Sequence, residues 1–491
     1  MDKLVHGIQS QTAALATLDM IPSFVYIPYY FHYDNHANDP HFMPTELLRE
    51  SFYLTLLDFP LFVGRLEADG SGHAWVVVDK DNLNIPEFLE SQSSVHFDDI
   101  QAAKFSWDAL PEAVATVSAI TTVGTGGVIK PANIHVVRLR DNSGIVLYIG
   151  IAHYLVDGAA YSEFVCRWAD VCRRLSSGAS SAELPSFQAS LSRSTISDHL
   201  PDDRRALDDP TRELITTTGL FARWLAWISP KTRSTILGAA LSLDSIEGHV
   251  FHISASKLAS LRASIQEHIT TSERISGNDV ITALLNMVVA QSEAECKQDA
   301  AATRGYLSSL ASYLFPSMYA QNSEFVTQVV VDIRPRLKGL SAARYIGNAV
   351  FTRCLASPME SLTSGIDAQS LALVAQNVRK LVNDVDPQYI GQYIDTLHKD
   401  PSHFMCPVAY ALTKTAMLVS NQSRFPLYKA DFGSGTPVWV IPIRTFLTNF
   451  ISILPAPPSA GGYVVHASMT TQATAKLLQN KFWSSAVDFL Y

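Results

Sequence analysis

The chain has 491 residues, of which 47% are hydrophobic and 17% are charged. A typical soluble domain carries roughly 25% charged residues, so this composition provides for a large interior and excludes an intrinsically disordered protein. The formal net charge is −9 and the charged residues are scattered along the chain. Because a binder of nucleic acid or of an anionic membrane needs a basic stripe, we expect neither partner.

The sequence also predicts the cellular setting. No stretch approaches the roughly 18 apolar residues that span a bilayer, and the N-terminus lacks the apolar core of a signal peptide. We therefore expect a soluble, cytoplasmic protein. The 5 cysteines are odd in number and form no Cys-x-x-Cys pair, which favours free thiols. We expect no metal site, because the histidines and aspartates between His32 and His41 are typical of a polar surface loop.

The first part of the chain alternates helix and strand patterns. Apolar spacing predicts a helix over residues 45–58, with Thr45 as its N-cap. Strands are predicted at 74–78, 134–139 and 145–152, and an Asp-Asn-Ser-Gly turn joins the last two as a hairpin. After Asp157 the spacing returns to that of a helix, which Asp157 is placed to cap.

A break in composition divides the chain. Residues 176–210 are rich in Ser, Asp and Pro and have almost no apolar periodicity. We interpret this segment as a crossover between two domains. The predicted organisation is an N-terminal domain at 1–183, a crossover linker at 184–212 and a C-terminal domain at 213–491.

The second part of the chain mixes the same elements. A capping box at residues 276–279 predicts the start of a helix, and residues 329–331 read as a strand. Apolar spacing predicts further helices over 367–382 and 471–490. Strands and helices interleave without a strict βαβ rhythm, so we expect an α/β fold with mixed sheets.

The sharpest local pattern is His153 followed four positions later by Asp157 and then by Gly158. With 15 histidines in the chain, chance gives roughly 0.04 such matches at average composition. A histidine that leaves a buried strand presents its imidazole at the mouth of a cleft, where it can act as a general base. Asp157 could assist it or could turn away and pair with an arginine. The alternative without catalysis is a buried histidine followed by a helix cap.

The pattern His153-x-x-x-Asp157-Gly158 resembles the HxxxDG motif of the BAHD-type acyl-CoA-dependent acyltransferases. Near the C-terminus, residues 431–435 (Asp-Phe-Gly-Ser-Gly) resemble the second motif of that family, DFGWG. Similar segments occur along nearly the whole chain, at residues 18–28, 59–66, 331–350 and 420–426. The length and the Ser- and Pro-rich crossover are most similar to the fungal branch, which includes trichothecene O-acetyltransferases.

The resemblance implies two chloramphenicol-acetyltransferase-like domains with mixed β-sheets and a central solvent channel. Acyl-CoA would enter from one face as co-substrate and a small-molecule acceptor from the other, with no tightly bound cofactor. His153 would deprotonate the acceptor, which then attacks the thioester without an acyl-enzyme. The resemblance also favours a monomer.

The resemblance further assigns roles to single residues. The catalytic pair is His153 and Asp157, with Asp157 held by a buried arginine. We expect this partner to be Arg334, with Arg336 as the competing candidate. Asp431 is expected to organise its loop. The residues with an implied structural role are Gly158, Arg334, Asp431, Gly433 and Gly435.

Two positions depart from the family pattern. Relatives carry Trp where this chain has Gln422, and Trp where it has Ser434. The first Trp can donate its indole N–H to the tetrahedral oxyanion, and Gln422 can donate through its amide instead. A missing oxyanion donor costs about 10²- to 10³-fold in rate. Ser420, Asn421 and Gln422 are therefore the candidates for contact with the oxyanion or the substrate.

The expected function is acyl-CoA-dependent acylation of a hydroxyl on an apolar fungal secondary metabolite. The altered Gln422 motivates an alternative, a cyclase, lyase or carbon–carbon bond-forming enzyme that uses His153 without CoA. A peptide-synthetase condensation domain usually doubles the histidine, and Ala152 occupies that place here. A binding protein without turnover is the third class, and the intact motif argues against it.

Overall fold

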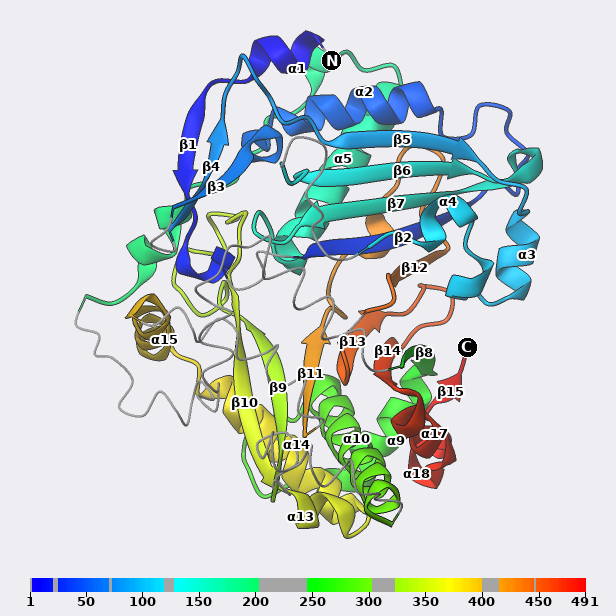
Figure 1. Ribbon diagram of the computed structural model, residues 1–491, viewed down its shortest axis with the longest axis vertical. Helices are drawn as coiled ribbons and strands as arrows, with labels where there is room; N and C mark the ends of the chain where they lie inside the picture. The colour runs from blue at the N-terminus through cyan, green and yellow to red at the C-terminus, as the bar shows by residue number, and fades with distance from the viewer. Residues whose placement is uncertain are drawn as a thin grey trace.

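The computed structural model describes residues 2–20, 25–69, 73–118, 128–202, 245–302, 323–399, 415–445 and 447–491 (Figure 1). Residues 2–202 are called the N-terminal half below, and residues 245–491 the C-terminal half. The end of the predicted linker, residues 203–212, lies outside the described residues, as does the predicted start of the second domain at 213.

A 5-stranded sheet forms the upper part of the molecule in Figure 1. Its strands follow the order β12 (Trp439–Pro442), β2 (Tyr26–Asp34), β7 (Gly144–Ala152), β6 (Ala132–Arg138) and β5 (Glu87–Gln92). Neighbouring strands are antiparallel, except that β5 and β6 are parallel. The hairpin predicted from the sequence is confirmed, because β6 and β7 pair antiparallel on either side of the short 3-10 helix η4 (Arg140–Asn142).

Two helices, α2 (Thr45–Leu56) and α5 (Gly158–Ser176), pack against each other beside this sheet. Trp168 of α5 is fully buried, and its indole N–H donates to the Leu48 carbonyl at 3.1 Å and to the Ser51 hydroxyl at 3.0 Å. Burial of a side chain of this size is worth several kcal/mol, about 3–5 when it is truncated to Ala. The packing therefore fixes α5 firmly against the core, and with it the segment that precedes α5.

The N-cap of α2 is not Thr45, and this sequence prediction is wrong. Pro44 occupies the cap position, and Thr45 is the first helical residue. The Thr45 hydroxyl donates to the Glu90 carboxylate and accepts a hydrogen bond from Arg138 at 2.8 Å. Because the Thr45 hydroxyl is hydrogen-bonded to residues of β5 and β6, it cannot accept from the free N–H groups at the start of α2.

The rest of the N-terminal half is built from short elements. A second, antiparallel sheet has 3 strands in the order β1 (Gln11–Ala14), β4 (Ala74–Val78) and β3 (Arg65–Ala68). The short helices are α1 (Asp2–Gly7), α3 (Phe97–Ala102) and α4 (Glu112–Ala115). The other 3-10 helices of this half are η1 (Thr17–Met20), η2 (Pro60–Val63), η3 (Trp107–Ala109), η5 (Ser181–Glu183), η6 (Arg193–Thr195) and η7 (Ser197–His199).

The C-terminal half contains a 7-stranded mixed sheet. Its order is β10 (Val350–Pro358), β9 (Glu324–Asp332), β11 (Ala416–Asn421), β13 (Phe450–Pro455), β14 (Tyr463–Thr470), β8 (Ile246–Ile253) and β15 (Asp488–Phe489). Strand β11 runs parallel to both of its neighbours, and the other pairs are antiparallel. In Figure 1, β11 points upward, toward the N-terminal half.

Helices cover one face of this sheet. Ile451 and Ile453 of β13 share a buried apolar cluster with Leu284 of α10, whereas Leu454, on the other face of β13, belongs to the core of the N-terminal half. The strands therefore have two buried faces, one toward their own helices and one toward the other half. The helices of this half are α9 (Ala255–Ile265), η8 (Gln266–His268), α10 (Gly277–Ala302), α13 (Met359–Thr363), α14 (Ala368–Asn383), α15 (Pro387–Lys399), η10 (Leu427–Lys429), α17 (Thr471–Gln479) and α18 (Lys481–Ala486).

Most helix predictions for this half are confirmed. Ser276 and Asp279 form the predicted capping box, with Ser276 N–H donating to the Asp279 carboxylate at 2.6 Å and Asp279 N–H donating to the Ser276 hydroxyl at 3.3 Å. Helix α14 matches the helix predicted for 367–382. The single helix predicted for 471–490 is wrong: Asn480 is extended and caps α18, so the chain breaks into two short helices and ends in a strand.

The predicted division of the chain needs a correction. Strand β12 lies within the predicted C-terminal domain in sequence, yet it pairs with β2 and forms the edge of the N-terminal sheet. The predicted linker is also packed, since Ser190 makes a bridge with Tyr345 and Arg193 is buried. Composition could not reveal either feature, because both depend on contacts with distant parts of the chain.

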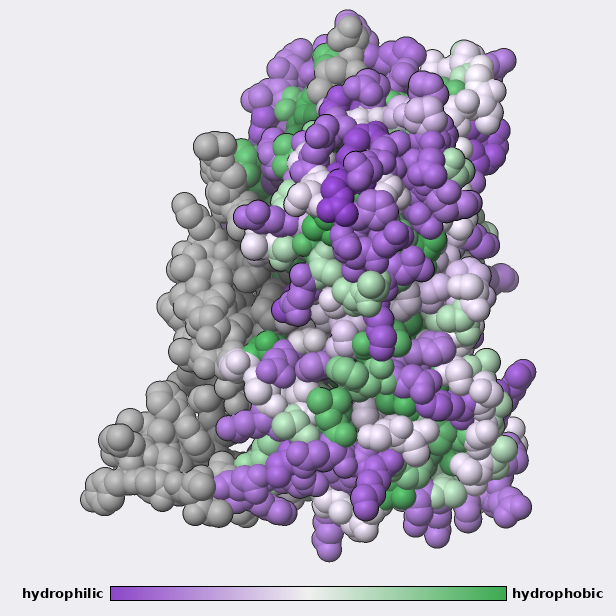
Figure 2. Space-filling model, turned by 90° about the vertical axis from the view of Figure 1, so that its right-hand side faces the viewer, coloured by the Kyte–Doolittle hydropathy of each residue, from purple (hydrophilic) through white to green (hydrophobic). Residues whose placement is uncertain are grey.

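Polar side chains lie mainly at the surface of the molecule, and apolar side chains lie mainly in its interior. Figure 2 shows hydrophilic side chains over most of the upper half, with small separate hydrophobic patches lower down. Within the described residues, no helix is both long enough and apolar enough to cross a membrane. The buried apolar residues of the described ranges form three clusters, and the third joins residues of both halves, among them Leu18, Ile196 and Val331.

Core packing in the C-terminal half can be tested with a pair of leucines. Leu284 of α10 is fully buried, whereas Leu373 of α14 is 57% exposed. We expect Leu284→Ala to lower the free energy of unfolding by about 2–5 kcal/mol, because it removes buried methyl groups and leaves a cavity. The matched variant Leu373→Ala should change it by no more than about 0.5 kcal/mol. Chemical denaturation measures both, and equal effects would contradict the described packing.

Candidate active site

His153 lies directly after strand β7, where the chain leaves the N-terminal sheet. All 9 residues of β7 are buried, as are Tyr154, Leu155 and Val156, but His153 itself is partly exposed. Its backbone N–H donates to the Val25 carbonyl at 2.9 Å, which continues the pairing of β7 with β2. Strand β7 and helix α5 thus hold the segment from both ends, with His153 partly exposed between buried neighbours.

Asp157 is buried and turned away from solvent. One carboxylate oxygen accepts from the Ala160 N–H at 3.0 Å and caps α5, as predicted, and it also accepts from Arg334 at 3.1 Å. The other oxygen accepts from Arg334 at 2.8 Å and from the Ala349 N–H at 2.9 Å. Of the two arginines considered from the sequence, Arg334 is therefore the partner, and Arg336 donates to the Val385 carbonyl instead. With both oxygens engaged, Asp157 shapes the loop and makes no hydrogen bond to the imidazole.

The pKa of Asp157 follows from this pairing. Burial raises the pKa of the carboxyl, but the Arg334 guanidinium and the donated hydrogen bonds outweigh burial and bring the pKa below its ordinary value. The ion pair is bidentate, the geometry in which arginine holds a carboxylate most strongly. Asp157 is therefore ionised throughout the neutral range.

The imidazole of His153 contacts Asn348. The His153 Nδ1 and the Asn348 Oδ1 are 3.1 Å apart, while the Asn348 amide nitrogen donates to the His153 carbonyl at 2.7 Å and to the Asp19 carboxylate at 2.9 Å. Both of these acceptors lack hydrogens, so they fix which end of the amide is nitrogen. The Asn348 oxygen then faces the ring and requires a proton on Nδ1. Nε2 is left with the free lone pair of a base.

Burial lowers the pKa of His153, and its hydrogen bonds and the charge of Asp157 offset only part of this effect. The pKa therefore lies below the ordinary value of about 6.5, and the imidazole is neutral near pH 7. A neutral imidazole with a free Nε2 can accept a proton at once.

Sequence reasoning missed three residues that support His153. They are Asn348, the buried Asp19 and Arg193. The Asp19 carboxylate also accepts from the Asn348 backbone N–H at 3.1 Å and from the Ala16 N–H at 2.9 Å. Arg193 donates to the Leu155 carbonyl at 3.0 Å and to the Ile346 carbonyl at 2.9 Å, and lies 3.6 Å from the Asp19 carboxylate. Asp19 and Asn348 fall in segments that resemble the family, so a closer study of those segments could have found them. Nothing in the sequence near Arg193 marks it.

The three candidates for oxyanion or substrate contact lie at the end of β11. Gln422 follows the strand, and its side-chain oxygen accepts from the Tyr29 hydroxyl while its side-chain nitrogen donates to the Ser420 hydroxyl at 3.1 Å. Asn421 turns aside, since its side-chain oxygen accepts from the Ser423 N–H at 2.9 Å. The structure thus joins Ser420 and Gln422 and separates Asn421 from them.

The second motif forms a tight loop on the surface of the N-terminal half. One Asp431 carboxylate oxygen accepts from the Gly433 N–H at 2.8 Å and from the Gly435 N–H at 3.0 Å. Both glycines have positive φ, 104° and 105°, which side chains rarely adopt. Ser434, which replaces the family tryptophan, accepts from the Met43 N–H at 3.3 Å. These hydrogen bonds stabilise the conformation of the loop itself and connect it to Met43, which precedes α2.

Gly158, the last residue of the first motif, is needed for space. A Cβ atom at this position would lie 2.4 Å from the ring of Phe425, in the segment that follows Gln422. The start of α5 thus packs directly against the segment after β11.

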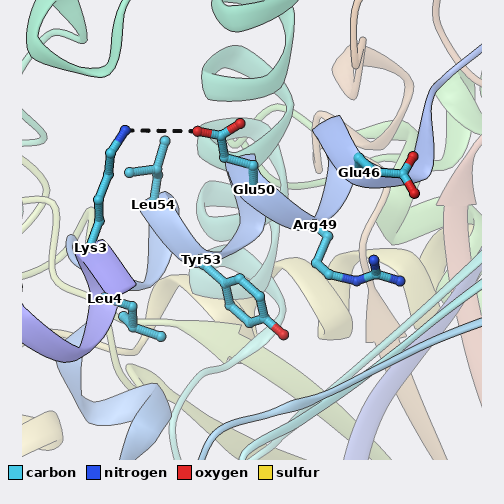
Figure 3. A pocket seen from close by; sticks show the side chains of 7 residues that line it. All are labelled: Lys3, Leu4, Glu46, Arg49, Glu50, Tyr53 and Leu54. Carbon is cyan, nitrogen blue, oxygen red and sulfur yellow. Dashed lines mark ion pairs between the residues drawn. The ribbon is translucent and has the colours of Figure 1, made fainter. Parts of the chain in front are cut away.

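Other potential sites in the described residues are weaker. No group of three His, Cys, Asp or Glu residues there is arranged to hold a metal ion. A cavity of about 560 Å³ lies between α1 and α2, away from His153, and Figure 3 shows charges of both signs around it. Its lining residues are Lys3, Leu4, Glu46, Arg49, Glu50, Tyr53 and Leu54.

The structure is therefore an α/β protein of two mixed-sheet halves that meet at His153 and Asn348. Residues 6–482 match the model of the Transferase family. The chain belongs to this family, that of the BAHD acyltransferases, and is an acyltransferase.

Individual relatives agree with this membership. The shikimate O-hydroxycinnamoyltransferase of Nicotiana tabacum is 22% identical over 466 residues, which cover 94% of this chain and 92% of the relative. The hydroxycinnamoyltransferase of Narcissus pseudonarcissus is 20% identical over 478 residues, covering 95% and 94%. Both relatives are plant proteins.

Solved structures share the fold. The structure of F. graminearum TRI101 complexed with coenzyme A and deoxynivalenol matches with a TM-score of 0.71 at 13% identity, covering 98% of this chain and 100% of the other. Vinorine synthase matches with a TM-score of 0.59 at 16% identity, covering 97% and 94%. The predicted fold class is confirmed: the chain has the two-domain, chloramphenicol-acetyltransferase-like α/β fold with mixed sheets.

The ion pair of Asp157 can be tested through stability. Asp157→Asn removes the buried charge partner of Arg334 and leaves it only the more exposed Asp332 at 3.3 Å, so we expect the free energy of unfolding to fall by up to about 3–5 kcal/mol. Because the pKa of Asp157 is lowered by folding, this contribution is present above its unfolded pKa of about 4 and is lost as the pH falls below it. Urea denaturation at pH 7 and at pH 3 should show a large gap between wild type and variant that narrows at low pH.

The matched control is Asp431→Asn, which affects a carboxylate bound only to N–H groups in its own loop. It should cost less than Asp157→Asn at pH 7. Wild-type stability for Asp157→Asn at pH 7 would contradict the role of the buried pair.

Proposed function

We propose that this acyltransferase transfers the acyl group of an acyl-CoA to a hydroxyl of an apolar small molecule, with His153 as general base. The observation that carries the proposal is the state of His153: a neutral, partly exposed imidazole whose Nδ1 is committed to Asn348. Nε2 is then the atom that takes the proton. Acyl-CoA is a co-substrate in this scheme, and no tightly bound cofactor is needed.

The reaction proceeds in two steps. Nε2 of His153 removes the proton from the acceptor hydroxyl as its oxygen forms a bond to the thioester carbonyl carbon. The carbonyl oxygen takes the electron pair and becomes a tetrahedral oxyanion. When the oxyanion collapses, the carbon–sulfur bond breaks, and the thiolate of CoA takes the proton back from Nε2. The products are an ester and free CoA, and no acyl-enzyme forms.

Structures of similar fold support the choice of substrates. F. graminearum TRI101 was solved with coenzyme A and deoxynivalenol and also with coenzyme A and T-2 mycotoxin. With the Ser-Asn-x-Ser-Arg-Phe-Pro run at residues 420–426, this likeness favours the fungal branch and a fungal secondary metabolite as acceptor. We further propose domains at 1–183 and 213–491 joined by the crossover 184–212, with β12 contributed to the first, and a monomeric, cytoplasmic enzyme without nucleic-acid or membrane partners.

One observation favours a second candidate. Gln422 replaces the tryptophan of relatives with a polar side chain. A cyclase, lyase or carbon–carbon bond-forming enzyme that uses His153 on a single substrate would also fit a base in a more polar site. Conversion of a substrate without any CoA thioester would favour this candidate.

The base can be tested by release of free thiol from acetyl-CoA. Acceptors would be hydroxylated apolar compounds, with deoxynivalenol among them. We expect wild type to release thiol only when an acceptor is present, and His153→Ala to lower kcat by about 10²- to 10⁴-fold, the contribution of a positioned general base. The matched control His135→Ala, at a β6 histidine bound to Ser91, should keep wild-type activity. Equal release by wild type and His153→Ala would overturn the role of His153.

Asn348 can be tested as a positioning residue through the pH profile. In wild type, the acidic limb of kcat/KM reports the pKa of His153, which lies below its ordinary value. The bond to Asn348 favours the protonated ring, so Asn348→Ala should lower this pKa further and move the limb to lower pH while reducing kcat. A variant that only loosens the fold would reduce the rate without moving the limb.

A further inference from the structure

The side-chain amide of Asn348 has both of its N–H groups bound to acceptors. One N–H donates to the Asp19 carboxylate at 2.9 Å, and the other donates to the His153 backbone carbonyl at 2.7 Å. A carboxylate and a backbone carbonyl accept hydrogen bonds and do not donate them. Asp19 is therefore the one side chain that holds the nitrogen end of this amide away from the His153 ring.

Asp19 reaches the amide from the N-terminal segment, where it lies in η1 and is fully buried. One of its oxygens accepts from the Ala16 N–H at 2.9 Å, and the other accepts from the backbone N–H and from the side chain of Asn348. The preceding residue, Leu18, belongs to the apolar cluster that contains Ala349 of the C-terminal half. The carboxylate is thus fixed in position by its own turn and by the packing of η1 on the segment of Asn348.

The predicted crossover contributes the positive charge that a buried carboxylate needs. Ser190 exchanges two backbone hydrogen bonds, of 2.9 Å and 2.8 Å, with residues 343–346, so the crossover runs beside the chain that leads into Asn348. Arg193 is buried there, 3.6 Å from the Asp19 carboxylate. A Cβ atom at Gly347 would lie 2.0 Å from an Arg193 nitrogen, so the guanidinium fits only because this residue is a glycine.

The orientation of the amide determines which nitrogen of His153 is the base. With the Asn348 oxygen 3.1 Å from Nδ1, the proton is on Nδ1 and the lone pair is on Nε2. If the amide turned over, an N–H would face Nδ1, and the proton of the neutral ring would move to Nε2. The wrong tautomer of a catalytic histidine lowers kcat by about 10⁴-fold in a Ser-His-Asp triad. A turned amide would also bring its oxygen against Asp19, and two acceptors repel each other.

We propose that Asp19 is a positioning residue for the general base: it keeps the Asn348 amide in the orientation that leaves Nε2 of His153 without a proton. Asp19 does not touch the substrate in this scheme and acts only through Asn348. The inference rests on the proposed function and deepens it, because it makes the tautomer of the base depend on a side chain of the N-terminal segment.

The first measurement is the tautomer of His153 at neutral pH. In protein whose histidines are labelled with ¹⁵N, the ring shifts distinguish a nitrogen that carries a proton from a bare nitrogen. The signals of His153 are those that disappear in His153→Ala. We expect the Nδ1–H form in wild type. Asp19→Asn should give a mixture with the Nε2–H form, because an amide at position 19 can donate to the oxygen of a turned Asn348.

The second measurement is turnover of acetyl-CoA with the acceptor found for wild type. Asp19→Asn should lower kcat by about 10-fold or more, the usual range for a group that orients a functional histidine, with little change in KM. In the Asn348→Ala background, Asp19→Asn should cause no further loss of kcat, because no amide is left to orient.

The matched control is Asp279→Asn. Asp279 is an equally buried carboxylate near the start of α10, and it accepts from the Ser276 N–H at 2.6 Å and from Nε of Arg379 at 2.9 Å. This variant loses a comparable buried carboxylate and should keep both the wild-type kcat and the wild-type tautomer of His153. Thermal unfolding confirms that each variant is folded at the assay temperature.

The outcomes separate this inference from the proposed function. An unchanged Nδ1–H tautomer in Asp19→Asn would overturn the inference whatever the kcat of the variant. An equal loss of kcat in the Asn348→Ala background would also overturn it, and both results would leave the proposed function intact. Because the tautomer is measured without turnover, absence of acyl transfer by wild type with every acceptor would refute the proposed function alone.

Discussion

The buried ion pair between Asp157 and Arg334 is the interaction on which the site depends. The two residues are 177 positions apart and come from opposite halves of the molecule. Removing two charges from water is costly, so the pair is stable only because both carboxylate oxygens are saturated, by the guanidinium and by two backbone N–H groups. The pair therefore joins the two halves at a defined point. Because Asp157 also accepts from the Ala349 N–H, it holds the loop of His153 against the segment that contains Asn348.

Around this pair the fold decides the chemical state of His153. The polar contacts of Asn348 with Asp19 and with the His153 backbone leave its oxygen as the only group that can face the ring. Arg193 supplies the charge that Asp19 needs in a buried position and also ties down the loop at Leu155. A segment that connects the halves in this way helps to hold the loop of His153.

The polar residue in place of the family tryptophan is also held by a hydrogen bond between the two halves. Gln422 is not an isolated polar side chain, because Tyr29 from one half and Ser420 from the other satisfy its oxygen and one of its N–H groups. The loss of an aromatic wall is thus accompanied by hydrogen bonds that hold the polar side chain in place. His153 and Gln422 thus both make side-chain hydrogen bonds across the interface between the halves.

The sequence by itself determined the class of the fold, the hairpin, most helices, the motif histidine and the membership implied by its motifs, since periodicity and short motifs are carried by neighbouring residues. It also narrowed the partner of Asp157 to Arg334 and Arg336. Only the tertiary structure decided between these two, placed β12 in the N-terminal sheet and joined Arg193, Asp19 and Asn348 to the histidine. These outcomes depend on the packing of segments far apart in the chain, and no local pattern of residues encodes which buried groups will meet.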